Sequence, residues 1–379
     1  MNFAFTEEQE QLRETARSFL ATHASSEAVR RAMQSELGFD PDAWKRIGSE
    51  LGWTAILVPE AYGGLGLGWV EVAALLEVTG EFLLCAPLLS TVGLGTNALL
   101  AAGTEDQKRE WLPRIADGRA IVTLAFAESA RDPGPGPIAA TFRREGEGFV
   151  LSGRKRSVVD GAAADAIVVA ARAPGTAGAD GLGLFLVRGD EPGLARRTLP
   201  TLDGTRRIAE IELRDVRLPG GAQFTGGGTG AAALAKVLDR AAIALAAEQV
   251  GGAQRCLDLA VEYAKGRVQF GRPIGSFQAI KHKCADAMVK VESGRSASYY
   301  AACVAAEDAP ELAQAASLAK AWCSDAYFRC AADCLQIHGG VGFTWDYDVH
   351  LHLKRAKASQ SFLGSPSWHR ERIARHMGL

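Results

Sequence analysis

The stretch of residues 236–283 constrains this chain more than any other, because it reads as a helix, a short basic loop and a second helix. Between Val237 and Tyr263, apolar residues recur at roughly helical spacing, and this pattern predicts a buried helix. Many of the residues between them are alanine or glycine, whose small size lets another element approach closely. We therefore expect this helix to pack tightly against its neighbours.

The loop of residues 265–278 combines three cations with two aromatic rings. Among them are Arg267, Arg272, Phe270 and Phe277, and the glycines and the proline of the loop fix its path. Guanidinium groups held beside aromatic faces suit a ligand that carries phosphate and a flat ring. On residue chemistry alone, a solvated turn between two bundle helices is an equally good interpretation.

Three motifs are spread over nearly the whole chain. RxQFGxPIxxFQ occupies residues 267–278, QIHGGVGF occupies residues 336–343, and FTEEQEQLRETARSF begins at Phe5. Their joint occurrence at this spacing resembles the acyl-CoA dehydrogenase family, for which the first two motifs are specific. The resemblance implies an FAD-dependent enzyme that removes hydrogens from the α and β carbons of an acyl-CoA. Electron-transfer flavoprotein is the electron acceptor that the resemblance implies.

Length and composition set bounds on the molecule. The 379 residues suffice for two or three domains, and 47% hydrophobic with 23% charged residues is an ordinary globular composition. A formal net charge of −2 gives no reason to expect nucleic acid or an anionic membrane as partner. The acidic start lacks a secretory signal, and no run of apolar residues is long enough to span a membrane. We expect a cytoplasmic protein.

The seven cysteines are scattered, and no two of them form a CxxC pair. Cys330 and Cys334 lie four residues apart on one helical face, a spacing that would give half a metal site. Buried reduced thiols are the stronger interpretation, so we expect no metal site.

The residue pattern divides the chain into three parts and predicts a multidomain α+β fold. Residues 1–120 read as an N-terminal helical domain that opens with a capping box at Thr6. Residues 121–218 alternate short β-type runs with turn clusters, which predicts a small barrel or sandwich; the family resemblance implies a β-barrel. After a glycine-rich linker, residues 231–379 read as a C-terminal four-helix bundle. The expected helices are about 6–21, 41–52, 69–83, 104–118, 231–264, 277–307, 309–338 and 346–376, and the expected strands are 121–126, 149–152, 166–171, 183–187 and 208–213.

The resemblance implies that each FAD site is shared by two chains. One subunit supplies its barrel to the flavin ring and a glutamate from its own bundle, while the neighbouring bundle contacts the ADP half of the cofactor. Residues of the second kind are present in this chain. Arg267 resembles the arginine that holds the pyrophosphate, and Phe270 resembles the ring near the adenine. The other expected contacts are Gln278, Gln336, Gly339 and Gly340; a plain helix C-cap is the competing interpretation of the two glycines, and His338 is expected to be a packed core histidine.

The residues that would hold the flavin ring are degraded. The family's EPGAGS loop corresponds to residues 128–137, where three prolines remove amide donors. Ser157 and Val159 stand where the family has the tryptophan and threonine of a WIT motif, so the indole and the hydroxyl are both lost. Leu363 stands where the family commonly has its glutamate base, and leucine cannot accept a proton. We therefore expect no catalytic residue at the usual positions.

A relocated base is the alternative. Some relatives carry the glutamate at a position that corresponds to Ala241, and Glu248 lies two helical turns further along, about 10 Å away. Apolar neighbours would raise the pKa of this carboxyl, as a general base requires. A buried contact or an ion pair with Arg255 is the other interpretation of Glu248. Asp239 is a weaker candidate.

These patterns favour one hypothesis over three others. The chain resembles a non-catalytic subunit of the α2β2 acyl-CoA dehydrogenases of bacterial steroid side-chain degradation, which also act on other bulky acyl-CoA substrates. Its partner would be a second acyl-CoA dehydrogenase-like subunit whose FAD it contacts. The alternatives are a self-sufficient homo-oligomeric dehydrogenase that uses Glu248, a flavin-free structural or acyl-binding homologue, and a flavin oxidase or monooxygenase of the same fold.

Overall fold

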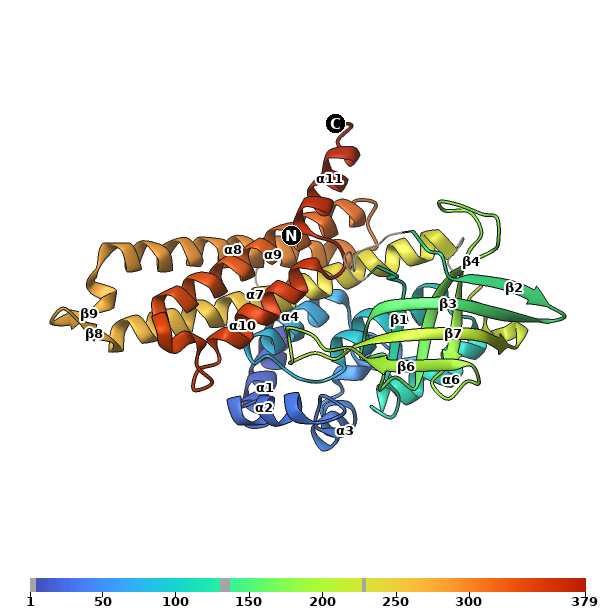
Figure 1. Cartoon of the computed structure of the whole chain (residues 1–379), viewed down its shortest axis with the longest axis horizontal. Helices are drawn as coiled ribbons and strands as arrows, with labels where there is room; N and C mark the ends of the chain where they lie inside the picture. Colours follow the sequence, from blue (N-terminus) through green and yellow to red (C-terminus); the bar gives the residue numbers. More distant parts are fainter. Residues whose placement is uncertain (1–4, 130–136, 227–229) are drawn as a thin grey trace.

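The computed structural model describes residues 5–129, 137–226 and 230–379. A sheet occupies one end of the long axis, a bundle of long helices extends to the other end, and the N-terminal helices pack beside both (Figure 1). Among the described residues, no helix combines the length and the apolar character that crossing a membrane requires.

The N-terminal helices begin at the residues that can cap them. The side chain of Thr6 accepts a hydrogen bond from the backbone N–H of Gln9, and the side chain of Gln9 accepts one from the backbone N–H of Thr6. Thr104 and Gln107 form the same capping box. Asp40 caps the helix that Pro41 opens. The helices are α1 (Glu7–His23), α2 (Ser26–Gln34), α3 (Pro41–Ser49), α4 (Trp69–Glu81), α5 (Asn97–Ala102) and α6 (Glu105–Ala116), with 3-10 turns η1 (Trp53–Ala55) and η2 (Glu60–Tyr62).

A π-helical segment, η3 (Leu89–Thr96), lies where the residue pattern predicts no element. Its glycines and threonines have low helix propensity, so the residue pattern does not predict a helix here. Gly95 explains part of this composition, because a Cβ at this position would lie 2.2 Å from the carbonyl oxygen of Val122. The segment therefore packs backbone against backbone on the first strand of the sheet.

The middle of the chain forms one curled seven-stranded sheet (Figure 1). Its order is β1-β4-β2-β3-β7-β6, with β5 also pairing with β4. All five predicted runs lie on strands. The pattern missed β2 and β6, because most side chains of both are polar and none of them is fully buried. The strands are β1 (Val122–Ala125), β2 (Thr141–Glu145), β3 (Gly148–Val159), β4 (Ala166–Arg172), β5 (Leu182–Arg188), β6 (Leu194–Thr198) and β7 (Ile208–Leu218), followed by η4 (Gly220–Ala222).

The C-terminal part is the predicted helical bundle, with one correction. The helix expected over residues 346–376 is two helices, broken between Ser361 and Pro366. Leu363 and Gly364 have φ values of +60° and +103°, and the Ser365 side chain caps the second helix. Four helices form the bundle and the last one packs on α9: α7 (Gly230–Gly266), α8 (Gln278–Ala306), α9 (Leu312–His338), α10 (Val349–Ser361) and α11 (Pro366–His376).

Small residues of α7 allow the close approach that the sequence predicts. A Cβ at Gly251 would lie 1.7 Å from the carbonyl oxygen of Glu77 in α4, and one at Gly252 would lie 2.4 Å from the Tyr327 ring in α9. Any larger residue at either position would push a neighbouring helix away. The helix α7 is therefore the central element against which α4, α8 and α9 pack.

Candidate functional site

The residues predicted to contact the ADP half of FAD lie at the end of the bundle remote from the sheet (Figure 1). Arg267 directly follows α7, Gln278 begins α8, and Gln336 lies in the last turn of α9. The ends of α7 and α9 are joined by the stacked rings of Tyr263 and His338, whose centroids are 4.1 Å apart. All six predicted residues are exposed, so their side chains or backbone are accessible at this end of the bundle.

A two-residue hairpin forms the tip of this end. The strands β8 (Val268–Gln269) and β9 (Arg272–Pro273) pair around Phe270 and Gly271, whose φ values of +53° and +75° are those of a type I′ turn. The side chain of Phe270 is 90% exposed. Exposing a whole phenyl ring to water is unfavourable, and such a ring is common at binding surfaces.

The two arginines of the loop differ in what surrounds them. The guanidinium of Arg272 lies 4.1 Å from the centre of the Phe277 ring, a cation–π contact within the loop itself. The side chain of Arg267 makes no hydrogen bond or ion pair with any residue that the structure describes. Arg267 is therefore a charged fork available to an external anion.

The glycines after α9 leave open space beside the backbone. Gly339 has φ +64° and caps α9, as the competing interpretation of this pair expects. A Cβ at Gly339 or Gly340 would meet no atom within 4 Å, so something outside this chain can approach the backbone there. His338 is the predicted core histidine: it is buried, its Nδ1 lies 2.9 Å from the carbonyl oxygen of Cys334, and burial lowers its pKa.

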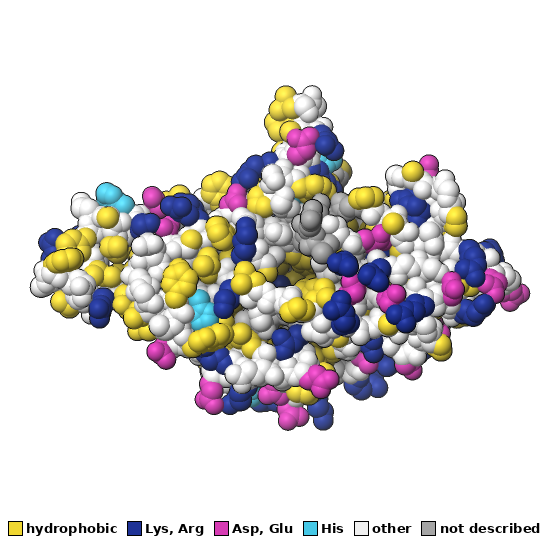
Figure 2. Space-filling model, in the orientation of Figure 1, with side chains coloured by type: hydrophobic (Ala, Val, Ile, Leu, Met, Phe, Trp, Pro, Cys, Tyr) yellow, Lys and Arg dark blue, Asp and Glu magenta, His cyan; other side chains and the backbone are white. Residues whose placement is uncertain are grey.

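The position expected for a flavin ring is an apolar cavity between the sheet and the bundle. Its volume is about 300 Å³, and Figure 2 shows a hollow lined by hydrophobic side chains on this face of the molecule. Ser157, with φ +58°, and Val159 line it from β3. The carbonyl oxygen of Val159 accepts a hydrogen bond from the Thr123 hydroxyl at 2.8 Å. Most of the proline-containing loop, residues 130–136, lies outside the described residues.

Leu363 occupies the position expected for the base, and its side chain has no carboxylate that could accept a proton. Its side chain is buried, and its carbonyl oxygen lies 3.0 Å from Nε2 of His369. The buried ammonium of Lys320 donates to the carbonyl oxygen of Gly364 at 3.2 Å. These contacts fix the turn between α10 and α11, from which Phe362 reaches the cavity.

Glu248 does not have the environment that a general base needs. Arg206 donates from Nη2 to Oε2 at 2.5 Å, and Arg355 donates from Nη1 to Oε1 at 2.8 Å. Burial alone would raise the pKa of this carboxyl, but the two guanidiniums outweigh burial and lower it. The expected raised pKa and the pairing with Arg255 are therefore both wrong. Asp239 is likewise held by the guanidinium of Arg372, at 2.8 Å from Nη2.

The partners of Glu248 belong to a buried network that the sequence did not reveal. Arg355 also donates from Nε to Asp203 at 2.9 Å and to the Thr205 hydroxyl at 2.8 Å. The network joins α7, α10 and the connection between β6 and β7. Glu248 and its partner Arg355 are separated by 107 residues, so no local spacing could have indicated the pair.

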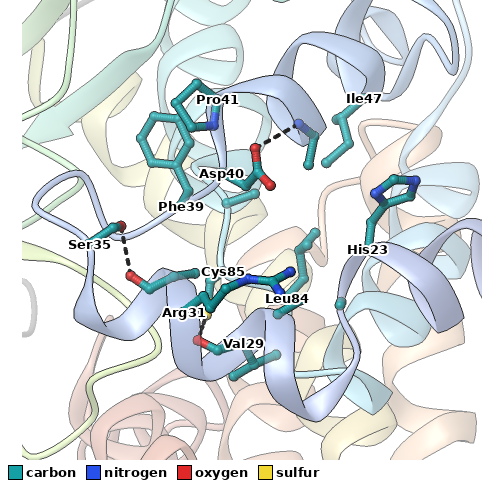
Figure 3. A pocket seen from close by; sticks show the side chains of 15 residues that line it. His23, Val29, Arg31, Ser35, Phe39, Asp40, Pro41, Ile47, Leu84 and Cys85 are labelled. Carbon is teal, nitrogen blue, oxygen red and sulfur yellow. Dashed lines mark hydrogen bonds between the residues drawn. The ribbon is translucent and has the colours of Figure 1, made fainter.

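A smaller cavity of about 210 Å³ lies among α1, α2 and α3 (Figure 3). Its polar groups serve the local fold. Asp40 accepts a hydrogen bond from the backbone of Ala43, and the hydroxyl of Ser35 donates to the carbonyl oxygen of Ala32. The thiol of Cys85 lies 3.5 Å from the carbonyl oxygen of Leu83. The cavity shares no lining residue with the cavity beside Val159.

The described residues form neither a metal-binding cluster nor a disulfide bond. Across the described residues, no group of three or more histidine, cysteine or acidic side chains is placed to hold a metal ion. All seven cysteines are free. Burial raises the pKa of both Cys330 and Cys334 to about 12, as expected for unreactive core thiols.

Three family descriptions together match nearly the whole chain. Residues 6–119 match the acyl-CoA dehydrogenase N-terminal domain, residues 129–216 its middle domain, and residues 228–378 its C-terminal domain. The acyl-CoA dehydrogenase IpdE2 of Mycolicibacterium smegmatis is 38% identical over 370 residues, which cover 98% of each chain.

Solved structures agree with this match. A chain of the ChsE4–ChsE5 complex from Mycobacterium tuberculosis has a TM-score of 0.90 and 29% identity, and the match covers 100% of this chain and 99% of that one. A chain of a variant of the Tcur3481–Tcur3483 steroid ACAD has a TM-score of 0.87 and 32% identity, and the match covers 98% of each chain.

Proposed function

The chain belongs to the acyl-CoA dehydrogenase family, and from that premise we propose that it is the partner subunit of an FAD-dependent acyl-CoA dehydrogenase, completing a cofactor site on a second chain. The family consists of flavoprotein oxidoreductases of lipid or steroid degradation. In this proposal the second chain carries the flavin ring and the base, and this chain binds the ADP half.

The observation that carries the proposal is the contrast between the two ends of the bundle. At one end, Arg267 is exposed without a partner among the described residues, and the space beside Gly339 and Gly340 is open. These features fit a pyrophosphate that belongs to another chain, because a guanidinium forms charged hydrogen bonds with such oxygens. Phe270 would pack against the adenine, while Gln278 and Gln336 would donate to the same half of the cofactor.

At the other end, the residues present do not fit a flavin ring and a base. Val159 offers no hydroxyl, and Leu363 offers no carboxylate. Glu248 is neutralised by Arg206 and Arg355, so it cannot take a proton from an α carbon at neutral pH without losing two ion pairs. FAD, when bound, supplies the acceptor for a β hydride; in this account that chemistry belongs to the second chain.

The substrate that we propose is an acyl-CoA with a bulky acyl group of the steroid side-chain kind. Support comes from the relatives: one of the solved structures is described as a steroid ACAD, and two of them come from assemblies of unlike chains. We propose that electron-transfer flavoprotein reoxidises the flavin, as is expected for acyl-CoA dehydrogenases.

The test uses two arginines of the same loop. The chain is co-expressed with the second homologue, the assembly is purified, and the FAD dissociation constant is measured by fluorescence after dilution. Arg267→Met should weaken FAD binding at least about tenfold, because a charged hydrogen bond is worth about 1.5–3 kcal/mol. Arg272→Met is the matched control, since its guanidinium lies on Phe277, and it should change the constant less than about twofold.

Three results would contradict the proposal. In the first, Arg267→Met and Arg272→Met retain FAD equally well. In the second, the chain purified alone carries a full complement of FAD and oxidises acyl-CoA, as a self-sufficient enzyme would. An assembly that holds no flavin with any partner would instead support a structural or acyl-binding protein.

A further inference from the structure

We propose that the cavity beside Val159 binds a compact apolar carboxylate in the place where relatives would hold a flavin ring. The inference rests on the proposed function, because the cavity is available only if this chain holds no flavin of its own. Three features of the described residues support it: the size of the cavity, its apolar walls and one incompletely paired arginine.

The walls of the cavity are mostly hydrocarbon. Val159 and Ile208 line it from the sheet, Leu199 from the connection between β6 and β7, and Ala358 and Phe362 from the end of α10. An apolar cavity of about 150 Å³ in another protein accommodates benzene. The volume here is about 300 Å³, so one fused or substituted ring system of the same kind fits. Burial of such a ring is favoured by about 25 cal/mol for each Å² removed from water.

Arg206 supplies the polar end of the cavity. Its Nη2 is paired with Glu248 at 2.5 Å, whereas its Nε and Nη1 form no hydrogen bond with any residue that the structure describes. Its side chain is 12% exposed and lines the cavity. Neither Nε nor Nη1 is fully buried, so both are open to the cavity, where a carboxylate could accept charge-assisted hydrogen bonds from them.

Asp203, the acid that lines the cavity, does not compete for the free donors of Arg206. Asp203 lines the cavity, but its carboxylate is occupied by Arg355 at 2.9 Å and by the backbone N–H of Thr205 at 2.9 Å. Within the network, the guanidiniums of Arg206 and Arg355 balance the carboxylates of Glu248 and Asp203. The network of these four residues therefore has no net charge of its own, and a ligand carboxylate would be held by the N–H donors of Arg206 that Glu248 leaves free.

The experiment measures binding to the full-length chain by titration calorimetry. Naphthalene-2-carboxylate is the charged probe, and naphthalene-2-methanol is the neutral probe of nearly the same shape. The acid should bind with one-to-one stoichiometry and at least tenfold more tightly than the alcohol. Arg206→Met should remove this preference and leave the affinity for the alcohol unchanged. Arg214→Met, which removes an exposed arginine of β7, is the control and should bind both probes as the parent does.

A second variant covers the case in which Arg206→Met does not fold. Ala358 is exposed, lines the cavity and takes no part in the ion pairs, so Ala358→Phe should place a ring over the mouth of the cavity and abolish binding of both probes. Equal affinity for the two probes, or acid binding that survives Ala358→Phe, would overturn the inference. If the isolated chain holds no flavin and does not bind naphthalene-2-carboxylate, only this inference is overturned. If the isolated chain holds flavin, the proposed function is overturned.

Discussion

Arg355 holds two carboxylates, Glu248 and Asp203, that lie 107 and 152 residues away in the chain. Each of the three residues is buried, and each would be costly to bury alone. The apolar residues next to Glu248 in the sequence suggest a raised pKa, but Arg206 and Arg355, which contact it in the folded chain, lower the pKa. At the residue scale, local spacing therefore identified a buried glutamate and could not identify its role.

Removing this carboxylate should destabilise the fold. Glu248→Gln leaves Arg206 and Arg355 partly unpaired, and loss of one partner of a buried ion pair costs about 3 kcal/mol. Denaturant unfolding would measure the loss. Glu262→Gln is the control, because Glu262 lies on the same helix and is exposed; it should change stability by less than about 0.5 kcal/mol. Equal stability of the two variants would show that the network contributes nothing.

The same residue predicts the response to acid. The pKa of Glu248 is lowered in the folded chain, so its contribution is present above the ordinary value of 4.5 and is lost as the pH falls through the lowered value. The parent should therefore lose stability below pH 4.5 more steeply than Glu248→Gln, as measured by denaturant midpoints. Parallel curves for the two proteins would contradict this expectation.

At the scale of elements, sequence signals located helix starts better than helix ends or exposed strands. The cap at Thr6, the helix starts near residues 41 and 104 and the bundle helices were predicted, because capping and hydrophobic spacing are local. The break after α10 was missed although Ser365 and the proline that follows form a standard helix start. Strands β2 and β6 were missed because their residues are polar, so pairing with neighbours determines them.

Lys320, which binds the turn between α10 and α11, should make the stability of the fold depend on pH in the alkaline range. Burial lowers the pKa of Lys320 from 10.5 to about 7. The unfolded chain therefore binds one more proton between these values, and folding stability should rise with pH from about 7 to 10, by at most about 1.4 kcal/mol per unit. Lys320→Met should lack this rise in denaturant midpoints. Identical slopes for parent and variant would mean that the ammonium is stabilised in place.

For the hairpin at the bundle tip, we expect a substitution that weakens FAD binding but hardly changes the stability of the chain. Gly271 has φ +75°, which a β-branched residue adopts only with strain of about 1–3 kcal/mol. Gly271→Val should distort the tip and weaken FAD retention by the two-chain assembly roughly tenfold. Local opening of the exposed hairpin should relieve most of the strain, so the melting temperature should change little. Gly266→Ala is the control, since a Cβ there meets no atom within 4 Å. Unchanged FAD retention in Gly271→Val would argue against a role for the hairpin.

At the scale of the whole molecule, the motifs indicated the family and the separation of two half-sites. The residues that the motifs predict for the ADP side lie at one end of the bundle because the fold brings the ends of α7 and α9 together; their binding role stays a prediction. The cavity and its arginine could not be predicted, because β3, the connection after β6 and the end of α10 meet only in the folded chain. The contrast between the outward-facing residues at the bundle tip and the apolar cavity at the ring position supports the proposal that two chains share one FAD site.

The most direct test of this claim is the amount of FAD in the purified two-chain assembly. FAD released by denaturation is quantified by absorbance and compared with the amount of each chain. We expect one FAD for each pair of unlike chains and none in this chain alone. Two FAD molecules per pair, or a flavin ring seated against Ser157 and Val159 in an assembly of identical chains, would contradict it.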